Sequence, residues 1–548
     1  MLRFKLAIAA LALVATPALA DTLVDNVDGI TLDETGEIKR FTGLVFDDEG
    51  RITQVLERGD RRPETEFGVD GGGQIMLPGM IDAHVHVMDL GFAALTLDLS
   101  GTTSLEDALA AIKQFAEDNP GRPWILGRGW NEEKWGLGTF PTAAELDAIV
   151  SDRPVWLERA DNHAHWANSL AMERAGITAE TPDPVGGRII RDPATGAASG
   201  VFVDKATALV SKHVPKPRPA DRDIAFAKAQ DALLAYGVTA VADMGTPIEN
   251  WQTYRRAGDR GTLRIRIMAY ADSIKAMELI GGPGPTPWLY QDKLRLAGIK
   301  LYLDGALGSR GAALKEPYSD AQDTRGLPLL TPAQLRNRMS RAALDQFQTA
   351  VHAIGDAANA DVLLAIAELA QTYKGDRRWR IEHAQIVDPV DLAMFGEHGI
   401  IASMQPLHQA SDRKMAEARL GPGRLDGAYA WRSILGAGAR LAFGSGAPVE
   451  PPDPFAGMAV AISRTDETGE PFGGWRAQET VSRTEALRSF TADAAYAGFA
   501  EGRFGRLLPG ERADFLLVDR DPMLASPSEI RDTRISEVWI GGERVLTR

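Results

Sequence analysis

At positions 77–86 the chain reads Leu77-Pro78-Gly79-Met80-Ile81-Asp82-Ala83-His84-Val85-His86. The run from 80 to 85 is largely apolar, which is typical of a buried β-strand. Alternate residues of a strand point to the same face, so His84 and His86 are placed to bind one ion through imidazole nitrogens. The stretch therefore predicts a buried strand that ends in a candidate metal site.

Seven more apolar, β-branched runs follow this strand, and helical patterns separate many of them. Strands that alternate with helices indicate a parallel sheet, and eight such units predict a closed (β/α)₈ TIM-like barrel. An open doubly wound sheet is the alternative, but no glycine-rich dinucleotide turn supports it. The predicted strands cover 80–85, 238–243, 264–269, 299–303, 349–352, 379–383, 400–404 and 441–445, and the clearest helices 221–235, 332–346, 357–373 and 484–496.

The two ends of the chain resemble each other, because both are rich in short strand patterns and turns. Neither end is long enough to bury much of a core alone. We therefore expect residues 21–74 and 501–548 to form one small composite β-sandwich domain. The barrel is then expected to cover 75–500, with an insertion at 90–236.

The first 20 residues have the layout of a secretory signal peptide. Arg3 and Lys5 precede an apolar run at 6–14, and Ala18-Leu19-Ala20 stands just before Asp21. The apolar run is shorter than the roughly 18 residues that a membrane span requires. We expect residues 1–20 to be cleaved, the protein to be exported to the periplasm or the extracellular space, and no membrane contact after cleavage.

Composition excludes several classes of function. The 548 residues contain no Cys, which removes disulfides, thiolate metal sites and cysteine nucleophiles, so any metal must be held by nitrogen and oxygen. The formal net charge of −15 argues against a nucleic-acid partner. No Gly-x-Ser-x-Gly nucleophile motif or phosphate-binding loop is present. A small-molecule substrate is expected, and a homodimer stays open.

Rarer polar side chains fall at the C-terminal ends of the predicted strands, where barrel enzymes build their active sites. Lys300 lies in the fourth run, and His352 and His383 end the fifth and sixth. Taken singly, either histidine is well explained by a structural hydrogen bond. Together with His84 and His86 they favour a metal centre. A surface role for Lys300 is disfavoured, because an unpaired ammonium is costly inside an apolar strand.

The stretch 77–86 resembles the first-strand signature of the amidohydrolase superfamily of metal-dependent hydrolases. The likeness continues through residues 298–310, 352–356 and 380–385, and covers nearly the whole mature chain. The motif Asp161-Asn162-His163-Ala164-His165-Trp166-Ala167-Asn168-Ser169, in the long insertion, is similar to that of the branch containing YtcJ-like proteins and N-substituted formamide deformylases. These motifs are specific for fold and superfamily but weak for substrate.

The resemblance implies a binuclear centre, usually with two Zn²⁺ ions. His84 and His86 would hold one ion, and His352 and His383 the other. Lys300 would react with CO₂ to give a carbamate whose two anionic oxygens bridge both ions. Lys300, His352 and His383 would thus also belong to the catalytic machinery. The implied reaction is hydrolysis of a C–N bond in an amide- or formamide-like small molecule, with the ions polarising the carbonyl and activating water.

One position departs from the family pattern. The family's eighth strand ends in Gly-Ser-Asp-Ala-Pro, and its Asp contacts metal and acts as a base, but this chain reads Gly444-Ser445-Gly446-Ala447-Pro448. Loss of a positioned base commonly costs on the order of 10²- to 10⁴-fold in rate. The chain is then an engineered or damaged hydrolase, a natural variant in which Glu450 or Asp453 substitutes, or a catalytically silent extracytoplasmic binding protein. A mononuclear deaminase-like site is a weaker alternative.

Other candidates carry weaker signals. The family match favours His163 as a substrate-facing residue, whereas His165 is expected to be solvated or packed. Trp130 is a candidate wall of an aromatic substrate pocket, or else a packing residue of the insertion. Arg310 is a candidate for binding a polar substrate group, or else pairs with a structural carboxylate. No spacing signal gives a role to His213, His398 or His408.

Overall fold

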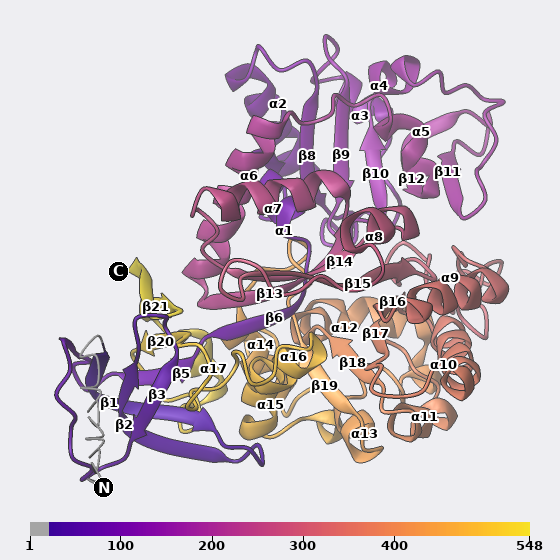
Figure 1. Cartoon of the computed structure of the whole chain (residues 1–548). Coiled ribbons are helices and arrows are strands. Elements are labelled where there is room, and N and C mark those ends of the chain that lie inside the picture. The colour runs from indigo at the N-terminus through magenta and orange to yellow at the C-terminus, as the bar shows by residue number, and fades with distance from the viewer. Residues whose placement is uncertain (1–20) are drawn as a thin grey trace, which may run out of the picture.

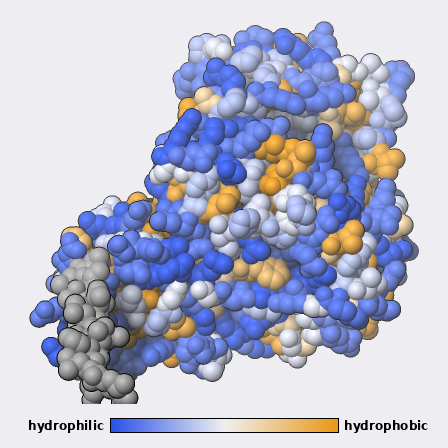
Figure 2. All heavy atoms as spheres, in the orientation of Figure 1, coloured by the Kyte–Doolittle hydropathy of each residue, from blue (hydrophilic) through white to orange (hydrophobic). Residues whose placement is uncertain are grey.

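The computed structural model describes residues 21–548, and the predicted signal peptide at 1–20 lies outside the described residues. In this range the strands form three sheets: one from both ends of the chain, one in the insertion, and one of eight parallel strands between them (Figure 1). No helix in the described range is long and apolar enough to cross a membrane. The face shown in Figure 2 is mostly hydrophilic, with scattered apolar spots.

The eight parallel strands form the barrel, and each pairs in parallel with the next. Every predicted strand overlaps one of them, because the apolar β-branched runs are buried on both faces. The strands are β6 (Met80–Val85), β13 (Val238–Thr246), β14 (Arg266–Ala271), β15 (Leu294–Tyr302), β16 (Gln348–Ala353), β17 (Arg380–His383), β18 (Ile401–Met404) and β19 (Arg440–Phe443).

Hydrogen bonds between the first and last strands nearly close the barrel. The amide of Gly446 donates to the carbonyl of His84 at 2.8 Å, and the amide of His86 donates to the carbonyl of Ala447 at 2.8 Å. The Ser445 hydroxyl donates to Asp82 Oδ2 at 2.5 Å. These bonds continue the sheet past the end of β19, so the predicted TIM-like barrel is confirmed and the open sheet is excluded.

Helices cover the outside of the barrel. Three match the predicted helices: α6 (Pro219–Ala235), α9 (Pro332–Leu344) and α10 (Asp356–Thr372). The predicted helix at 484–496 is wrong as one element. It is two helices, α15 (Arg483–Ser489) and α16 (Ala492–Ala497), because Thr491 leaves helical dihedrals and its hydroxyl donates to the carbonyl of Leu487 at 2.6 Å.

The remaining helices around the barrel are short or of moderate length. They are α1 (Val87–Ala93), α7 (Ile248–Asp259), α8 (Ile274–Gly281), α11 (Ala393–Glu397), α12 (Pro406–Leu420), α13 (Trp431–Gly436), α14 (Pro454–Ser463) and α17 (Pro527–Arg531).

The insertion forms its own layer against the barrel, seen at the top of Figure 1. Its six-stranded sheet packs around a separate core that contains Ile125, Leu157 and Trp166. The strands are β7 (Leu97–Asp98), β8 (Ile125–Trp130), β9 (Val155–Arg159), β10 (Ala164–Ala167), β11 (Gly187–Arg191) and β12 (Ala198–Asp204), and the helices α2 (Leu105–Asp118), α3 (Ala143–Asp147), α4 (Ser169–Arg174) and α5 (Ala208–Ser211).

Strands from both ends of the chain lie in one sheet, where the yellow C-terminal strands stand beside the indigo N-terminal ones in Figure 1. β5 pairs antiparallel with β20, which joins the two ends. The predicted sandwich is not confirmed, because the strands form one continuous sheet rather than two facing ones. They are β1 (Thr22–Leu32), β2 (Ile38–Phe46), β3 (Ile52–Leu56), β4 (Phe67–Asp70), β5 (Ile75–Pro78), β20 (Phe515–Val518), β21 (Ile535–Ile540) and β22 (Glu543–Thr547).

Candidate active site

The five residues predicted to bind metal come together at the C-terminal ends of the barrel strands. The ring centroid of His84 lies 5.4 Å from that of His86 and 4.6 Å from that of His383. The rings of His352 and His383 are 4.5 Å apart. Lys300 Nζ lies 3.4 Å from His84 Nε2. Four imidazoles and one amine from β6, β15, β16 and β17 therefore share one end of the barrel, and we call them the imidazole cluster.

Burial favours the neutral forms of these groups. It holds the pKa values of His84, His352 and His383 well below the ordinary value, with added effects from Lys300 and neighbouring histidines. Burial lowers the pKa of His86 to about 3 and that of Lys300 to about 7. Neutral imidazoles have the free lone pairs that metal binding requires. A lysine with this pKa is partly deprotonated at neutral pH.

A buried ion pair orients His84. Its Nδ1 lies 2.7 Å from Glu382 Oε2, and Glu382 Oε1 accepts a hydrogen bond from Arg380 Nε at 2.8 Å. Arg380 is fully buried and also donates to the carbonyl of Ala83 at 2.8 Å. This contact directs His84 Nε2 toward Lys300, as a carboxylate commonly orients a metal-binding histidine.

Two further polar side chains contact the cluster. Gln405 Oε1 lies 2.8 Å from His383 Nδ1. Asp304 Oδ1 lies 3.5 Å from His352 Nε2, and the Asp304 carboxylate accepts the amides of Ala313, Ile354 and Gly355. Gln405, Asp304 and Glu382 were not predicted from the sequence, although Glu382 directly precedes His383 and Asp304 lies within residues 298–310, which resemble the family.

The donor set fits metal binding. His352 Nε2 is buried without a hydrogen-bond partner in the described chain, as expected of an atom that awaits a ligand. No three His, Asp or Glu side chains of residues 21–548 surround a single ion position. The predicted arrangement does not need such a triplet, because each ion takes two imidazoles and Lys300 is the shared third ligand. The fit therefore depends on Lys300 being carboxylated.

Gly446 places no side chain in the cluster. Its φ of +72° lies in the left-handed region that favours glycine. A Cβ built there would lie 2.8 Å from His408 Nε2. The His408 ring is nearly parallel to that of His383, at 6.1 Å and 14°. His408 was given no role from the sequence, since its position next to Gly446 depends on contact between separate elements.

The two carboxylates suggested as substitutes for the missing Asp lie elsewhere. Asp453 is the N-cap of α14 and accepts the amide of Ala456 at 3.0 Å, so its carboxylate already has a structural partner. Glu450 neighbours Ser411 and Asp412, and burial raises the pKa of Glu450 to about 7. Neither carboxylate has a hydrogen bond or ion pair with the imidazole cluster in the described residues.

The insertion brings His163 to the cluster. Its ring centroid lies 5.5 Å from that of His352, and its Nδ1 lies 2.7 Å from Asp204 Oδ1. Burial alone would lower the pKa of His163, but the Asp204 and Asp161 carboxylates raise it above the ordinary value. His165 instead stacks on Trp156 at 4.6 Å, in the packed role expected for it. His163 thus faces the site and His165 does not.

Trp130 does not wall a substrate pocket. The side chain is fully buried, its indole nitrogen donates to the carbonyl of Leu157 at 2.8 Å, and its ring packs on Trp166 at 6.1 Å. These contacts are those expected under the alternative interpretation of Trp130, a packing residue of the insertion.

Arg310 takes part in a structural ion pair. Its Nη2 lies 2.9 Å from Asp320 Oδ2, and Asp320 also pairs with Arg419. This contact is the one expected under the alternative interpretation of Arg310, pairing with a structural carboxylate.

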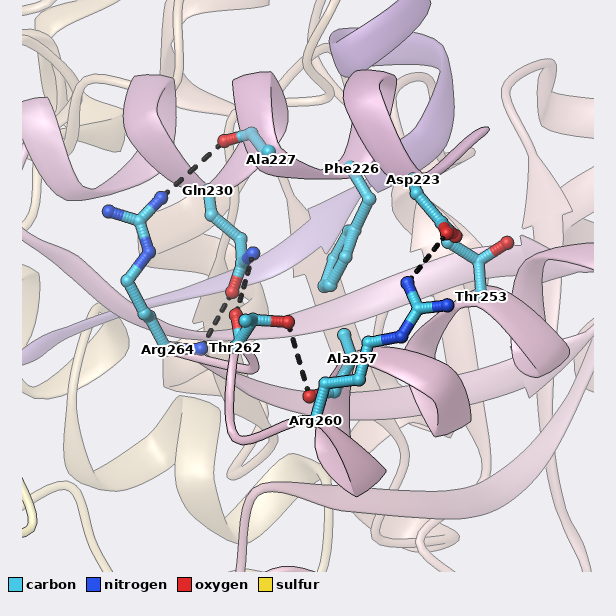
Figure 3. Close-up of a pocket in the computed structure, with 9 residues that line it drawn as sticks. All are labelled: Asp223, Phe226, Ala227, Gln230, Thr253, Ala257, Arg260, Thr262 and Arg264. Carbon is cyan, nitrogen blue, oxygen red and sulfur yellow. Dashed lines mark hydrogen bonds and ion pairs between the residues drawn. The ribbon is translucent and has the colours of Figure 1, made fainter. Parts of the chain in front are cut away.

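A cavity lies on the outside of the barrel, away from the cluster. It measures about 140 Å³ between α6 and α7, where Phe226 forms one wall and an ion pair joins Asp223 to Arg260 (Figure 3). Gln230 Oε1 accepts the amide of Arg264 at its other end. None of the predicted site residues lines it, so the cavity has no link to the proposed chemistry.

The sequence and the fold of this chain are similar to those of known proteins. Residues 68–546 match the family model described as "Amidohydrolase family". The protein YtcJ of Bacillus subtilis (strain 168) is 32% identical, over 89% of this chain and 91% of its own. N-substituted formamide deformylase of Arthrobacter pascens is 26% identical, over 96% and 98%. A crystal structure of an uncharacterized metal-dependent hydrolase from Pyrococcus horikoshii matches with a TM-score of 0.74 and 26% identity, over 92% of this chain and 99% of that one.

Proposed function

Because the chain belongs to the amidohydrolase family, we propose that it is a metal-dependent hydrolase of C–N bonds in amide- or formamide-like small molecules. The observation that carries this proposal is the convergence of four imidazoles, those of His84 and His352 fully buried, with the buried Lys300 at one end of the barrel. The relative named N-substituted formamide deformylase supports the formamide-like substrate class.

The proposed centre holds two divalent ions, with zinc the expected metal. His84 and His86 would hold one ion, His352 and His383 the other, and Lys300 both. The chemistry that such a pair of ions supplies is polarisation of the substrate carbonyl and a lowered pKa of bound water.

Burial lowers the pKa of Lys300 and so favours the neutral amine that carboxylation requires. Because burial lowers the pKa of Lys300 to about 7, a substantial fraction of neutral amine is present at neutral pH. The amine lone pair forms a bond to the carbon of CO₂, and the nitrogen releases one proton. The product is a carbamate anion, which supplies two anionic oxygen ligands where the amine supplies none.

Residues around the cluster fix its geometry and its contact with substrate. Glu382 orients His84, and Gln405 orients His383. His163 is held by Asp204 and faces the same space from the insertion, where its Nε2 is available to bind the substrate carbonyl group. The insertion would thereby supply one substrate-binding residue to a site at the end of the barrel.

A catalytically silent extracytoplasmic binding protein on the same fold is the second candidate. Gly446 favours it, because no carboxylate reaches the cluster from the end of β19 and neither Glu450 nor Asp453 substitutes. In both cases export rests on the signal-peptide pattern of residues 1–20.

The test combines metal analysis with hydrolysis assays. The full chain is purified with added Zn²⁺ and bicarbonate and assayed against N-substituted formamides, aryl amides and carbamates. We expect two ions per chain and turnover that a chelator abolishes. Two ions without turnover on any of these substrates would favour the binding protein, and a metal-free protein would overturn the proposed centre.

A further inference from the structure

Gly446 and His408 compete for one space. A Cβ at position 446 would lie 2.8 Å from His408 Nε2 and 2.9 Å from its Cε1, closer than such atoms pack in proteins. The left-handed φ of Gly446 also disfavours a side chain there. A side chain at 446 and the imidazole at 408 therefore exclude each other in the present arrangement. In this chain the imidazole of His408 occupies that space, and position 446 is glycine.

The position of His408 ties it to the imidazole cluster. It lies in the first turn of α12, which begins at Pro406 directly after Gln405. Gln405 contacts His383, and the His408 ring lies nearly parallel to the His383 ring. On its other side, Gly446 is hydrogen-bonded through its amide to the carbonyl of His84. His408 thus lies between the ends of β18 and β19, beside the predicted metal-binding residue His383 and beside Gly446.

His408 Nε2 is buried and has no hydrogen-bond partner in residues 21–548. Buried polar atoms rarely remain unpaired, so this nitrogen is expected to meet a water or a ligand. Burial lowers the pKa of His408 to about 4, which leaves the imidazole neutral and able to accept a hydrogen bond.

We propose that His408 takes the place of the missing β19 side chain: its Nε2 accepts a hydrogen bond from the reacting water on the side of the site where Gly446 has no side chain. His408 is then a catalytic residue, supplied by α12 rather than by a barrel strand. The proposal rests on the proposed hydrolytic function and names a residue of that same site.

The first test is spectroscopic and does not require turnover. The full chain is loaded with Co²⁺, whose visible absorption reports the ligands and water around the ion. We expect His408→Ala to shift the visible bands, and the exposed control His213→Ala to leave them unchanged. Identical spectra for His408→Ala and the native chain, at equal cobalt content, would overturn the proposal.

The second test measures hydrolysis in the same variants. We expect His408→Ala to lower kcat by on the order of 10²-fold with KM within about threefold, because the water and not the substrate loses its partner. If the native chain hydrolyses a substrate and His408→Ala is equally fast, this inference fails and the proposed function stands. If no substrate is hydrolysed while the cobalt bands respond to His408→Ala, the proposed function fails and the His408 contact stands.

The third test asks whether the two positions share one space. We expect Gly446→Asp to lower Tm by several degrees, because the new Cβ meets the imidazole, and His408→Ala in the same chain to restore most of that loss. The double variant should also retain zinc against a chelator better than His408→Ala alone. Additive changes in Tm for the two substitutions would show that the positions are independent and contradict the proposal.

Discussion

The ends of β17 and β19 lie in the same barrel but present different chemistry. At β17 the strand supplies both His383 and the carboxylate of Glu382, which orients His84. Directly after β19 come Ser445, which binds Asp82 and helps to nearly close the barrel, and then Gly446, which has no side chain. The space beside Gly446 is filled by His408 from α12. The difference shows that one strand end carries its own polar groups, while at the other a neighbouring helix places an imidazole beside the strand end.

The largest expected effect comes from the β17 end. Glu382→Gln leaves Arg380 buried without its carboxylate partner, which typically destabilises a protein by about 3–5 kcal/mol. It also removes the anion that orients His84, so zinc affinity should fall by roughly 10- to 100-fold. Chemical unfolding and chelator competition measure the two effects.

The matched control is Glu501→Gln, which removes an exposed carboxylate from Arg378 but leaves Asp376 as its partner, and should cost about 1 kcal/mol or less. Equal destabilisation by the two substitutions would show that the buried Arg380–Glu382 pair contributes no more to stability than the Arg378–Glu501 pair.

We expect the stability of the protein to depend on pH through Glu450, which lies in the loop after β19. Burial raises the pKa of Glu450 to about 7, so the folded state holds this proton more tightly than the unfolded chain does. Its contribution to stability is fully present below about pH 4.5 and is lost as the pH rises to about 7, by at most about 3 kcal/mol. Unfolding free energies of the native chain and of Glu450→Gln, measured from pH 4.5 to 8, give the difference. A difference that stays constant over this range would contradict the burial of Glu450.

Gln405 links the two strand ends, because it contacts His383 and directly precedes α12. Gln405→Ala removes one hydrogen bond, which contributes about 1 kcal/mol to stability. The same change should weaken zinc binding by about 10-fold or more, since His383 loses its orientation. Isothermal titration with zinc tests this, with the exposed Gln371→Ala as control; unchanged affinity in Gln405→Ala would assign Gln405 to packing alone.

The smallest effect is expected outside the cluster. Arg310→Ala breaks a partly exposed ion pair with Asp320 and should change stability by about 0–1 kcal/mol, with KM unchanged. A tenfold rise in KM with unchanged Tm would restore the substrate-binding role that the geometry argues against.

The sequence was sufficient for features set by local pattern. Apolar β-branched runs separated by helices predicted all eight barrel strands, and the His-x-His pair with strand-end residues Lys300, His352 and His383 predicted which side chains converge. These features follow from residue spacing along single strands. The barrel geometry then brings the strand ends together.

Other features depend on contacts between separate elements and were not predictable in this way. Trp130 fits either a pocket or a core, and only the packing of Trp166 against it decides between them. His408 shows no spacing signal because its importance arises from the absence of a side chain at Gly446. The helix expected at 484–496 is broken by a local hydrogen bond of Thr491 that competes with the helix.

The most direct test of the central claim is the metal content of the purified full chain. We measure zinc per chain by elemental analysis after supply of Zn²⁺ and bicarbonate, for the native protein, for Lys300→Ala and for the exposed control Lys275→Ala. The account predicts two ions in the native protein and the control, and fewer than one in Lys300→Ala. No zinc in the native protein, or two ions in Lys300→Ala, would contradict a centre built from four imidazoles and one shared lysine.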